Sequence, residues 1–417
     1  VFIEKVKEAR AIMAPSLACK NGTSAPTMYA VGNSHLDLEW LWSVEETMRK
    51  GARTLGNQIR LLEEYDDYLY IHSQPWILAS VKKDYPEFYE EIKEWVKKGR
   101  IIVEGGMWVE SDTNIPSGES IIRQFLVGKQ FISEEFGTES EILWLPDVFG
   151  CSAVLPQIMK GCGIKYFMNA KVAWVYNGGA PFPYNNFIWR GLDGSEVLTH
   201  VTGDYASGAS PNMIRDKWVH LNEERMDIPA KLFLYGHGDG GGGATRTHQE
   251  YIKREKDLEG LPKVKMASPK EYFEYVENDC EVNNKYQGEL YFAAHRGTYT
   301  SQAKTKKLNR QSEKALRETE LWAAFLQKDT SVSEELKPLW MEVLFNHFHD
   351  VIPGSSITRV YERTEKSYAK VIAEANAMME HICSSSLSDK QDVFTVFNSL
   401  SWDRNELVEL PNGYQKA

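Results

Sequence analysis

The sequence predicts an α/β fold in which parallel βα units come first, a helical bundle follows and a β segment comes last. From residue 28 to about 266, short β-rich runs alternate with longer amphipathic stretches, which is the pattern of parallel βα units. After Tyr299 the pattern changes to long stretches rich in Lys, Glu and Leu with few breakers, which indicates a helical bundle. The last segment is β-like, with turn residues at Asn398 and Asp403.

The α/β region is expected to contain seven strands separated by helices. The expected strands are 28–34, 68–73, 101–106, 141–146, 165–170, 196–201 and 231–236. Apolar spacing of three and four residues predicts helices over 76–98 and 118–136. A further helix over 268–278 is expected to begin at Ser268, with Pro269 in its first position. This pattern fits either an open doubly wound sheet or a barrel, and in both a site lies where the strands end.

Three long helical patterns, at 303–330, 333–349 and 356–384, form the expected bundle. The beginning of the chain, VFIEKVKEAR, resembles a cut helix rather than a signal peptide. We therefore expect the chain to be truncated at both ends.

Composition excludes several classes of function. The chain has 417 residues, 42% of them hydrophobic, which indicates two or three domains with a large core. A net charge of -11 without basic runs argues against a nucleic-acid partner, and no apolar run is long enough to cross a membrane. Five scattered cysteines without a CxxC pair favour a reducing, cytoplasmic location. The sequence leaves open whether the protein forms a homo-oligomer.

Titratable residues follow several of the predicted strands. His35 and Asp37 close the first strand and point to the same side, so they could hold one cation, although a strand-end histidine is often only satisfied by hydrogen bonds. Asp147 follows the fourth strand, where it could also be a helix cap. Together they place carboxylates and an imidazole at one edge of the sheet.

A glycine-rich loop, GHGDGGGG (236–243), follows the seventh strand. Such a loop indicates that a ligand or another backbone approaches closely. A phosphate cradle is disfavoured because no Lys-Ser or Lys-Thr follows and because Asp239 would repel phosphate. The loop is expected to present Asp239 to a neutral group.

Two more histidines, His347 and His349, lie just before a Pro-Gly break near the end of a bundle helix. They could form part of a solvated face or reach the same site. Two His and several Asp residues at element ends make a nitrogen and oxygen ligand set that suits zinc. A further carboxylate suggests acid/base work beside the metal.

The sequence resembles the family 38 glycoside hydrolases, the class II α-mannosidases, and most closely their bacterial and cytosolic-type branch. The resemblance rests on five ordered motifs: GNSHLDLEWLW (32–42), WLPDVFGCSAVLPQI (144–158), YGHGDGGGG (235–243), HRGTYTS (295–301) and NHFHDVIPGSS (346–356).

The resemblance implies a role for each matching residue. One zinc ion would be bound by His35, Asp37, Asp147 and His349, although Co²⁺ or another divalent ion could use the same ligands. Asp147 would also be the nucleophile, and Asp239 the general acid/base. Mannose would contact Trp40, Phe149 and Asp350. His347 departs from the family pattern, because many relatives carry a different polar residue there.

The implied fold is a seven-stranded α/β barrel followed by a three-helix bundle and β-sandwich domains. The expected division is an N-terminal helical remnant (1–27), the catalytic barrel domain (28–294), the three-helix middle domain (295–385) and the start of a truncated C-terminal β domain (386–417).

The implied activity is retaining, exo-acting hydrolysis of terminal α-D-mannosyl residues through a covalent mannosyl-enzyme. Two alternatives are a metal-dependent polysaccharide deacetylase, which also combines an α/β barrel with His and Asp ligands, and a non-catalytic mannose-binding remnant. The linkage that is cleaved does not follow from the sequence.

Overall fold

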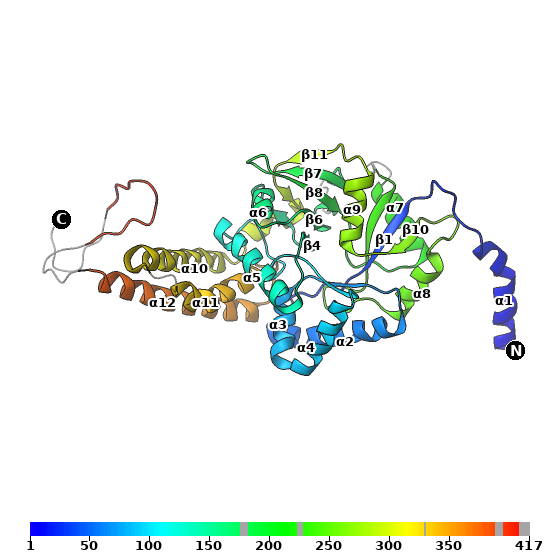
Figure 1. Ribbon diagram of the computed structural model, residues 1–417, viewed down its shortest axis with the longest axis horizontal. Helices are drawn as coiled ribbons and strands as arrows, with labels where there is room; N and C mark the ends of the chain where they lie inside the picture. Colours follow the sequence, from blue (N-terminus) through cyan, green and yellow to red (C-terminus); the bar gives the residue numbers. More distant parts are fainter. Residues whose placement is uncertain (176–181, 223–227, 329–330, 388–394, 408–417) are drawn as a thin grey trace.

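The computed structural model describes residues 1–175, 182–222, 228–328, 331–387 and 395–407. It consists of a mixed α/β body, a group of long helices that extends to one side, and an N-terminal helix that stands apart on the other side (Figure 1). The fold class predicted from the sequence, α/β, is confirmed.

Two five-stranded sheets form the centre of the α/β body. In the first sheet, β1 pairs in parallel with β9 over its whole length, with β10 at its beginning and with β2 at Gly32, and β2 pairs with β3. Its strands are β1 (Thr27–Gly32), β2 (Tyr70–His72), β3 (Ile101–Val103), β9 (Ala230–Tyr235) and β10 (Lys263–Met266).

The second sheet has the order β11-β7-β8-β6-β4. Within it β4, β6 and β8 are parallel, whereas β7 runs antiparallel to β8. Its strands are β4 (Ile142–Leu145), β6 (Tyr166–Asn169), β7 (Asn186–Arg190), β8 (Glu196–Val201) and β11 (Lys285–Gln287).

Single parallel bridges join the two sheets on both sides. Gly105 pairs with Leu143, and Ser207 pairs with Tyr235. A short antiparallel pair, β5 (Gly150–Cys151) with β12 (Leu290–Tyr291), lies beyond the end of β4. The carboxyl ends of the parallel strands therefore face one common region, which is where the sequence places the candidate site.

All seven predicted strands are present, and the strands β5, β7, β10, β11 and β12 were missed. The sequence of β10, KVKM, alternates lysines with apolar residues and so contains no continuous apolar run. β7 is an antiparallel strand that the alternation of strands and helices did not predict.

Helices cover the sheets on the outside: α2 (Val44–Glu64), α3 (Pro75–Asp84), α4 (Pro86–Lys97), α5 (Gly118–Phe136), α6 (Leu155–Gly161), α7 (Pro211–Asn222), α8 (Arg246–Glu255) and α9 (Pro269–Asp279). The prediction for α5 is confirmed: the Ser117 side chain accepts a hydrogen bond from Ser120 N, and Gly137 ends the helix with φ 65°. Short 3-10 helices lie at η1 (Lys171–Ala173) and η2 (Ala293–Tyr299).

One helix prediction was wrong. The stretch 76–98 forms two helices, α3 and α4, that meet at Tyr85. Pro86 has no N–H to continue the first helix and pushes the preceding residue out of the helical region, and Tyr85 indeed adopts φ -138°, ψ 62°.

Three helices, α10 (Ala303–Trp322), α11 (Val332–Asn346) and α12 (Thr358–Ser385), pack side by side beyond the α/β body (Figure 1). α10 continues into a short π-helix, η3 (Ala323–Gln327). A separate core holds them together, with Leu316, Leu336, Trp340, Val343 and Tyr368 almost fully buried.

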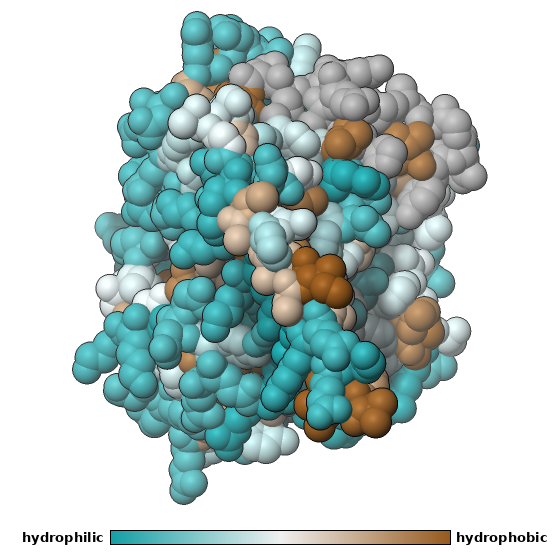
Figure 2. Space-filling model, turned by 90° about the vertical axis from the view of Figure 1, so that its right-hand side faces the viewer, coloured by the Kyte–Doolittle hydropathy of each residue, from teal (hydrophilic) through white to brown (hydrophobic). Residues whose placement is uncertain are grey.

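The two ends of the chain carry little buried surface. α1 (Phe2–Leu17) buries none of its residues and exposes Phe2, Ile3 and Ile12. The face of the molecule at that end is mainly hydrophilic, with small apolar groups scattered over it (Figure 2). Residues 395–407 contain no strand, and the rest of the expected C-terminal β segment lies mostly outside the described residues. No helix in the described part of the chain is long and apolar enough to cross a membrane.

Candidate active site and metal centre

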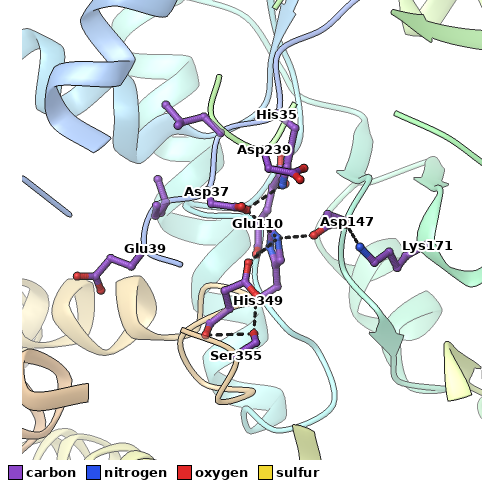
Figure 3. Close-up of polar contacts among 12 residues, drawn as sticks. His35, Asp37, Glu39, Glu110, Asp147, Lys171, Asp239, His349 and Ser355 are labelled. Carbon is purple, nitrogen blue, oxygen red and sulfur yellow. Dashed lines mark hydrogen bonds and ion pairs between the residues drawn. The ribbon is translucent and has the colours of Figure 1, made fainter. Parts of the chain in front are cut away.

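Four predicted ligands meet at the carboxyl ends of the strands. One donor atom from each of His35, Asp37, Asp147 and His349 lies within 4.8 Å of the others, and all four residues are buried. His35 and Asp37 follow β1, Asp147 follows β4, and His349 comes from the turn after α11 (Figure 3). The structure therefore brings together residues that follow strands of both sheets and a residue from the helical region.

His35 lies between two carboxylates. Its Nε2 is 3.0 Å from Asp37 Oδ1, and its Nδ1 is 3.0 Å from Glu110 Oε2. Burial alone would lower the pKa of His35, but the charges of Glu110 and Asp37 raise it well above its usual value. Two acids around one imidazole show that this position favours a cation.

His349 presents its Nε2 to the same cluster. Its Nδ1 donates to the main-chain oxygen of Glu110 at 2.8 Å, which leaves Nε2 with a lone pair. That Nε2 is 3.4 Å from Asp147 Oδ2 and 3.5 Å from Asp37 Oδ1, and it has no hydrogen-bond partner among the described residues. Although burial opposes it, contacts with Asp147 and Asp37 raise the pKa of His349 to about 10, so the lone pair on Nε2 belongs to the deprotonated ring that a metal ion would bind.

Asp147 is held as an anion. Lys171 Nζ contacts its Oδ1, and Lys171 also lies over the ring of Trp174 with a separation of 4.2 Å. Burial by itself would raise the pKa of Asp147, but the contacts with His349 and Lys171 keep it well below its ordinary value. A carboxylate that stays ionised can bind a metal or attack an electrophile.

Asp239 lies in the glycine-rich loop, half-buried, and faces the same centre (Figure 3). Tyr205 Oη donates to its Oδ1 at 2.8 Å and also interacts with Asp147, and burial together with these two acids raises the pKa of Tyr205. Tyr205 is therefore influenced by both carboxylates, and it donates its hydrogen bond to Asp239.

The glycines of this loop allow two backbones to pack against each other. Asp37 N donates to Asp239 O at 2.8 Å, and Gly241 N donates to His35 O at 2.9 Å. A Cβ on Gly236, whose φ is +128°, would lie 2.2 Å from Asn33 O. The close approach predicted from the sequence is therefore that of the His35–Asp37 segment, and it fixes Asp239 beside the ligand cluster.

Each of the three expected sugar contacts lies within three residues of a ligand in the chain: Trp40 after Asp37, Phe149 after Asp147 and Asp350 after His349. Phe149 is buried with its ring centre 4.8 Å from that of His295, and Trp40 is half-buried against Trp42. Asp350 is buried, and its Oδ1 accepts a hydrogen bond from Ser355 Oγ at 2.5 Å. Burial and the charge of Asp37 raise the pKa of Asp350 to about 7.

His347 does not belong to the cluster. It is fully buried, with its Nε2 2.7 Å from Asn309 Oδ1 on α10, so a solvated face is also excluded. Burial lowers its pKa to about 4. It is a neutral structural residue at the junction between the helices and the α/β body.

Sequence reasoning missed three residues of the site: Glu110, Lys171 and Tyr205. Each follows a strand of the α/β body, β3, β6 and β8 respectively. The rule that sites form where parallel strands end could have found Lys171, which comes directly after β6. Glu110 and Tyr205 lie several residues beyond their strands, and the sequence does not indicate how close such residues come to the site.

The residues present fit a metal ion. Two imidazole nitrogens and two carboxylates are the donors that zinc prefers, and no cysteine belongs to the cluster. The buried, unpaired Nε2 of His349 points to the same conclusion, because a buried polar atom needs a partner.

The chain is similar to known glycosyl hydrolases and α-mannosidases. Residues 25–295 match the family described as the glycosyl hydrolases family 38 N-terminal domain, and residues 293–385 match the alpha mannosidase middle domain. The chain is 38% identical to human alpha-mannosidase 2C1 over 97% of its own length and 39% of the relative's. It is 42% identical to alpha-mannosidase G of Dictyostelium discoideum over 87% of its own length and 34% of the relative's.

The fold is similar to that of an α-mannosidase from Enterococcus faecalis V583, with a TM-score of 0.74, 19% identity, and coverage of 86% of this chain and 42% of the other. The chain thus spans about two fifths of the length of the relatives that it matches. Since the family match extends over most of the chain, the chain belongs to the glycosyl hydrolases of family 38.

Proposed function

We propose that this chain carries the catalytic part of a retaining, exo-acting α-mannosidase that removes terminal α-D-mannosyl residues from oligosaccharides or glycans. The observation that carries the proposal is the buried His35, Asp37, Asp147 and His349 cluster next to Asp239. Relatives at 38–42% identity that are named α-mannosidases support the substrate class.

The scaffold that we propose for this site is a seven-stranded barrel. β9, β1, β2 and β3 form one part of the ring and β4, β6 and β8 the other, and the bridges Gly105–Leu143 and Ser207–Tyr235 support its closure. We further propose that α10, α11 and α12 form the family's middle domain, which brings His349 to the barrel.

His35, Asp37, Asp147 and His349 would hold one zinc ion, and Co²⁺ could use the same donors. When bound, the ion supplies Lewis acidity and fixes sugar hydroxyls. Trp40 and Phe149 offer apolar faces for the sugar ring, and Asp350 offers a carboxylate for its hydroxyls.

Asp147 is the proposed nucleophile. Its pKa is held low by His349 and Lys171, so it is ionised whenever the sugar binds, and it forms a covalent bond with the anomeric carbon. Both Asp147 and Asp239 act on Tyr205, which supports a paired arrangement of the kind found in retaining glycosidases, whose two carboxyl groups lie roughly 5–5.5 Å apart.

Asp239 is the proposed general acid/base. It would protonate the leaving oxygen and then deprotonate the water that releases mannose. Tyr205 donates to Asp239 Oδ1, so it orients the carboxyl group and leaves the other oxygen for the leaving group.

The decisive experiment combines metal analysis with an assay on an activated aryl α-mannoside, before and after chelation and return of zinc. Activity that is lost on chelation and restored by zinc is the expected result. Bound metal with mannose affinity but no hydrolysis would instead identify a binding remnant. Acetate release from an acetylated polysaccharide, without mannosidase activity, would identify a deacetylase, an alternative that family membership disfavours.

We also propose a cytoplasmic location. The five cysteines are all free thiols, as expected in a reducing compartment. The partner is a mannose-containing glycan or glycoside.

A further inference from the structure

Glu110 contacts both histidines of the ligand cluster, each through a different group. Its carboxylate lies against His35, and its main-chain carbonyl lies against His349 (Figure 3). It belongs to the segment after β3. The residue is buried, with 2% of its surface exposed.

The carboxylate selects the tautomer of His35. Glu110 Oε2 lies 3.0 Å from His35 Nδ1, and a carboxylate can only accept a proton there. The proton of a neutral His35 therefore belongs on Nδ1, and Nε2, which faces Asp37, keeps its lone pair. Ser73 Oγ donates to Glu110 Oε1 at 2.6 Å and so holds the carboxylate in place. The two atoms are within hydrogen-bond distance, but the contact between His35 Nδ1 and Glu110 Oε2 is not aligned as a full hydrogen bond.

The carbonyl selects the tautomer of His349 in the same way. A carbonyl accepts but does not donate, so Nδ1 of His349, at 2.8 Å, carries the proton. Main-chain pairing fixes this carbonyl: Ser111 bridges to Phe348, and Asp112 N donates to His347 O at 2.9 Å. The second contact therefore does not depend on the Glu110 side chain.

We propose that Glu110 is a positioning residue that holds Nδ1 of both histidines, so that Nε2 of each faces the cation site, through its side chain for His35 and its carbonyl for His349. The inference rests on the proposed function, because it requires that the cluster binds a metal. Partners of this kind behind a histidine ligand typically contribute 10–100-fold in metal affinity.

The test measures zinc affinity by competition with a chromophoric chelator, together with the visible absorption of the Co²⁺ form. Glu110→Gln keeps an acceptor but loses the charge, and Glu110→Met loses both. We expect zinc to bind roughly 10-fold more weakly in the first and up to about 100-fold more weakly in the second, with a changed Co²⁺ spectrum. Ser73→Ala, a milder change that only frees the carboxylate, should weaken zinc binding by a smaller factor.

Glu104→Gln is the matched control. Glu104 is also a buried acid just after β3, but its carboxylate accepts from Ser140 and from the main-chain N–H groups of Glu141 and Ile142. The Glu104→Gln variant should leave zinc affinity and the Co²⁺ spectrum unchanged. Equal losses in Glu104→Gln and Glu110→Gln would overturn the inference, since the effect would then be general loosening.

The inference would also be overturned if both Glu110→Gln and Ser73→Ala bound zinc with an affinity within about twofold of the wild type. These two variants decide the question if Glu110→Met does not fold. A wild-type chain that binds no zinc at all would overturn the metal site itself, and that result is distinct because every variant and the control would share it.

Discussion

Asp147 and Asp239 lie close together but in different surroundings. Asp147 is buried against His349 and contacts Lys171, whereas Asp239 sits half-buried in a glycine loop and accepts from a neutral phenol. Positive groups around Asp147 stabilise its charge. The proposed division into nucleophile and acid/base therefore follows from the neighbours of each carboxylate.

Replacing these two acids should have different kinetic effects. Asp147→Ala should abolish turnover on every substrate, because it removes the nucleophile. Asp239→Asn should lower kcat/KM by 10²–10⁴-fold for alkyl α-mannosides, which need protonation of the leaving group, and much less for activated aryl α-mannosides. The measurement compares kcat/KM on both substrates. Equal impairment of Asp239→Asn on the two would contradict the acid/base role.

Glu255 at the end of α8 is a buried acid away from the site. Its carboxylate oxygens have no hydrogen-bond partner among the described residues, and burial raises its pKa to about 7. The folded pKa exceeds the unfolded value, so folding stability should fall as pH rises from roughly 4.5 to 7 and stay lower above that.

Glu255→Gln removes this titration. Its free energy of unfolding should exceed that of the wild type at pH 8, and the difference should shrink toward pH 5; urea denaturation at both values measures it. Glu250→Gln, on the more exposed side of the same helix, should not change the pH dependence in this range. A pH-independent effect of Glu255→Gln would argue against a buried titrating carboxyl group.

At the level of the elements, helix α5 packs tightly against the segment between β3 and Glu110. A Cβ on Gly128 would lie 2.5 Å from the main-chain carbon of Met107 and 2.6 Å from Gly106 O. Backbone cannot move as easily as a flexible side chain, so α5 has room for only a hydrogen atom here.

Gly128→Ala should therefore destabilise the protein by about 1–3 kcal/mol, although alanine favours helices by about 1 kcal/mol over glycine. Gly118→Ala, in the first turn of the same helix, meets nothing within 4 Å and should be neutral or slightly stabilising. Thermal or urea unfolding of both variants gives the comparison. A stable Gly128→Ala would mean that α5 can shift away from the segment that carries Glu110.

Elements with strong local signals could be predicted from the sequence, and those fixed by distant contacts could not. The Ser117 cap and Gly137 mark both ends of α5, and the prediction of its bounds is confirmed. Pro86 carried the signal that 76–98 divides, but amphipathic spacing on both sides obscured it. His35, Asp37 and Asp239 were found from their strand ends, whereas Glu110 reaches His35 across 75 positions of the chain, and only the fold brings the two together.

For the whole molecule, the ligand cluster is a junction between two regions. His349 follows α11, while the other three ligands belong to the α/β body. A bidentate ion pair between Arg363 on α12 and Glu39, two residues beyond Asp37, joins the regions nearby. A bound metal would hold the regions together at one more point.

Zinc should therefore raise the unfolding temperature of the chain. A ligand that binds only the folded state stabilises it by about 2.7 kcal/mol at 100 times its Kd. The measurement is calorimetry of the chelated protein with and without added zinc, and His349→Ala should remove most of the increase. An identical Tm with and without zinc in the wild type would show that no metal binds at the junction.

The order of the ligands along the chain has a consequence for biosynthesis. His35 and Asp37 leave the ribosome first of the four, Asp147 follows, and His349 emerges 312 residues after Asp37. Until then, the cluster lacks one donor, and Ser111, next to Glu110, lacks its bridge partner Phe348. A nascent chain can therefore fold most of its sheets without a complete metal site. Metal binding at full affinity requires His349, which follows α11.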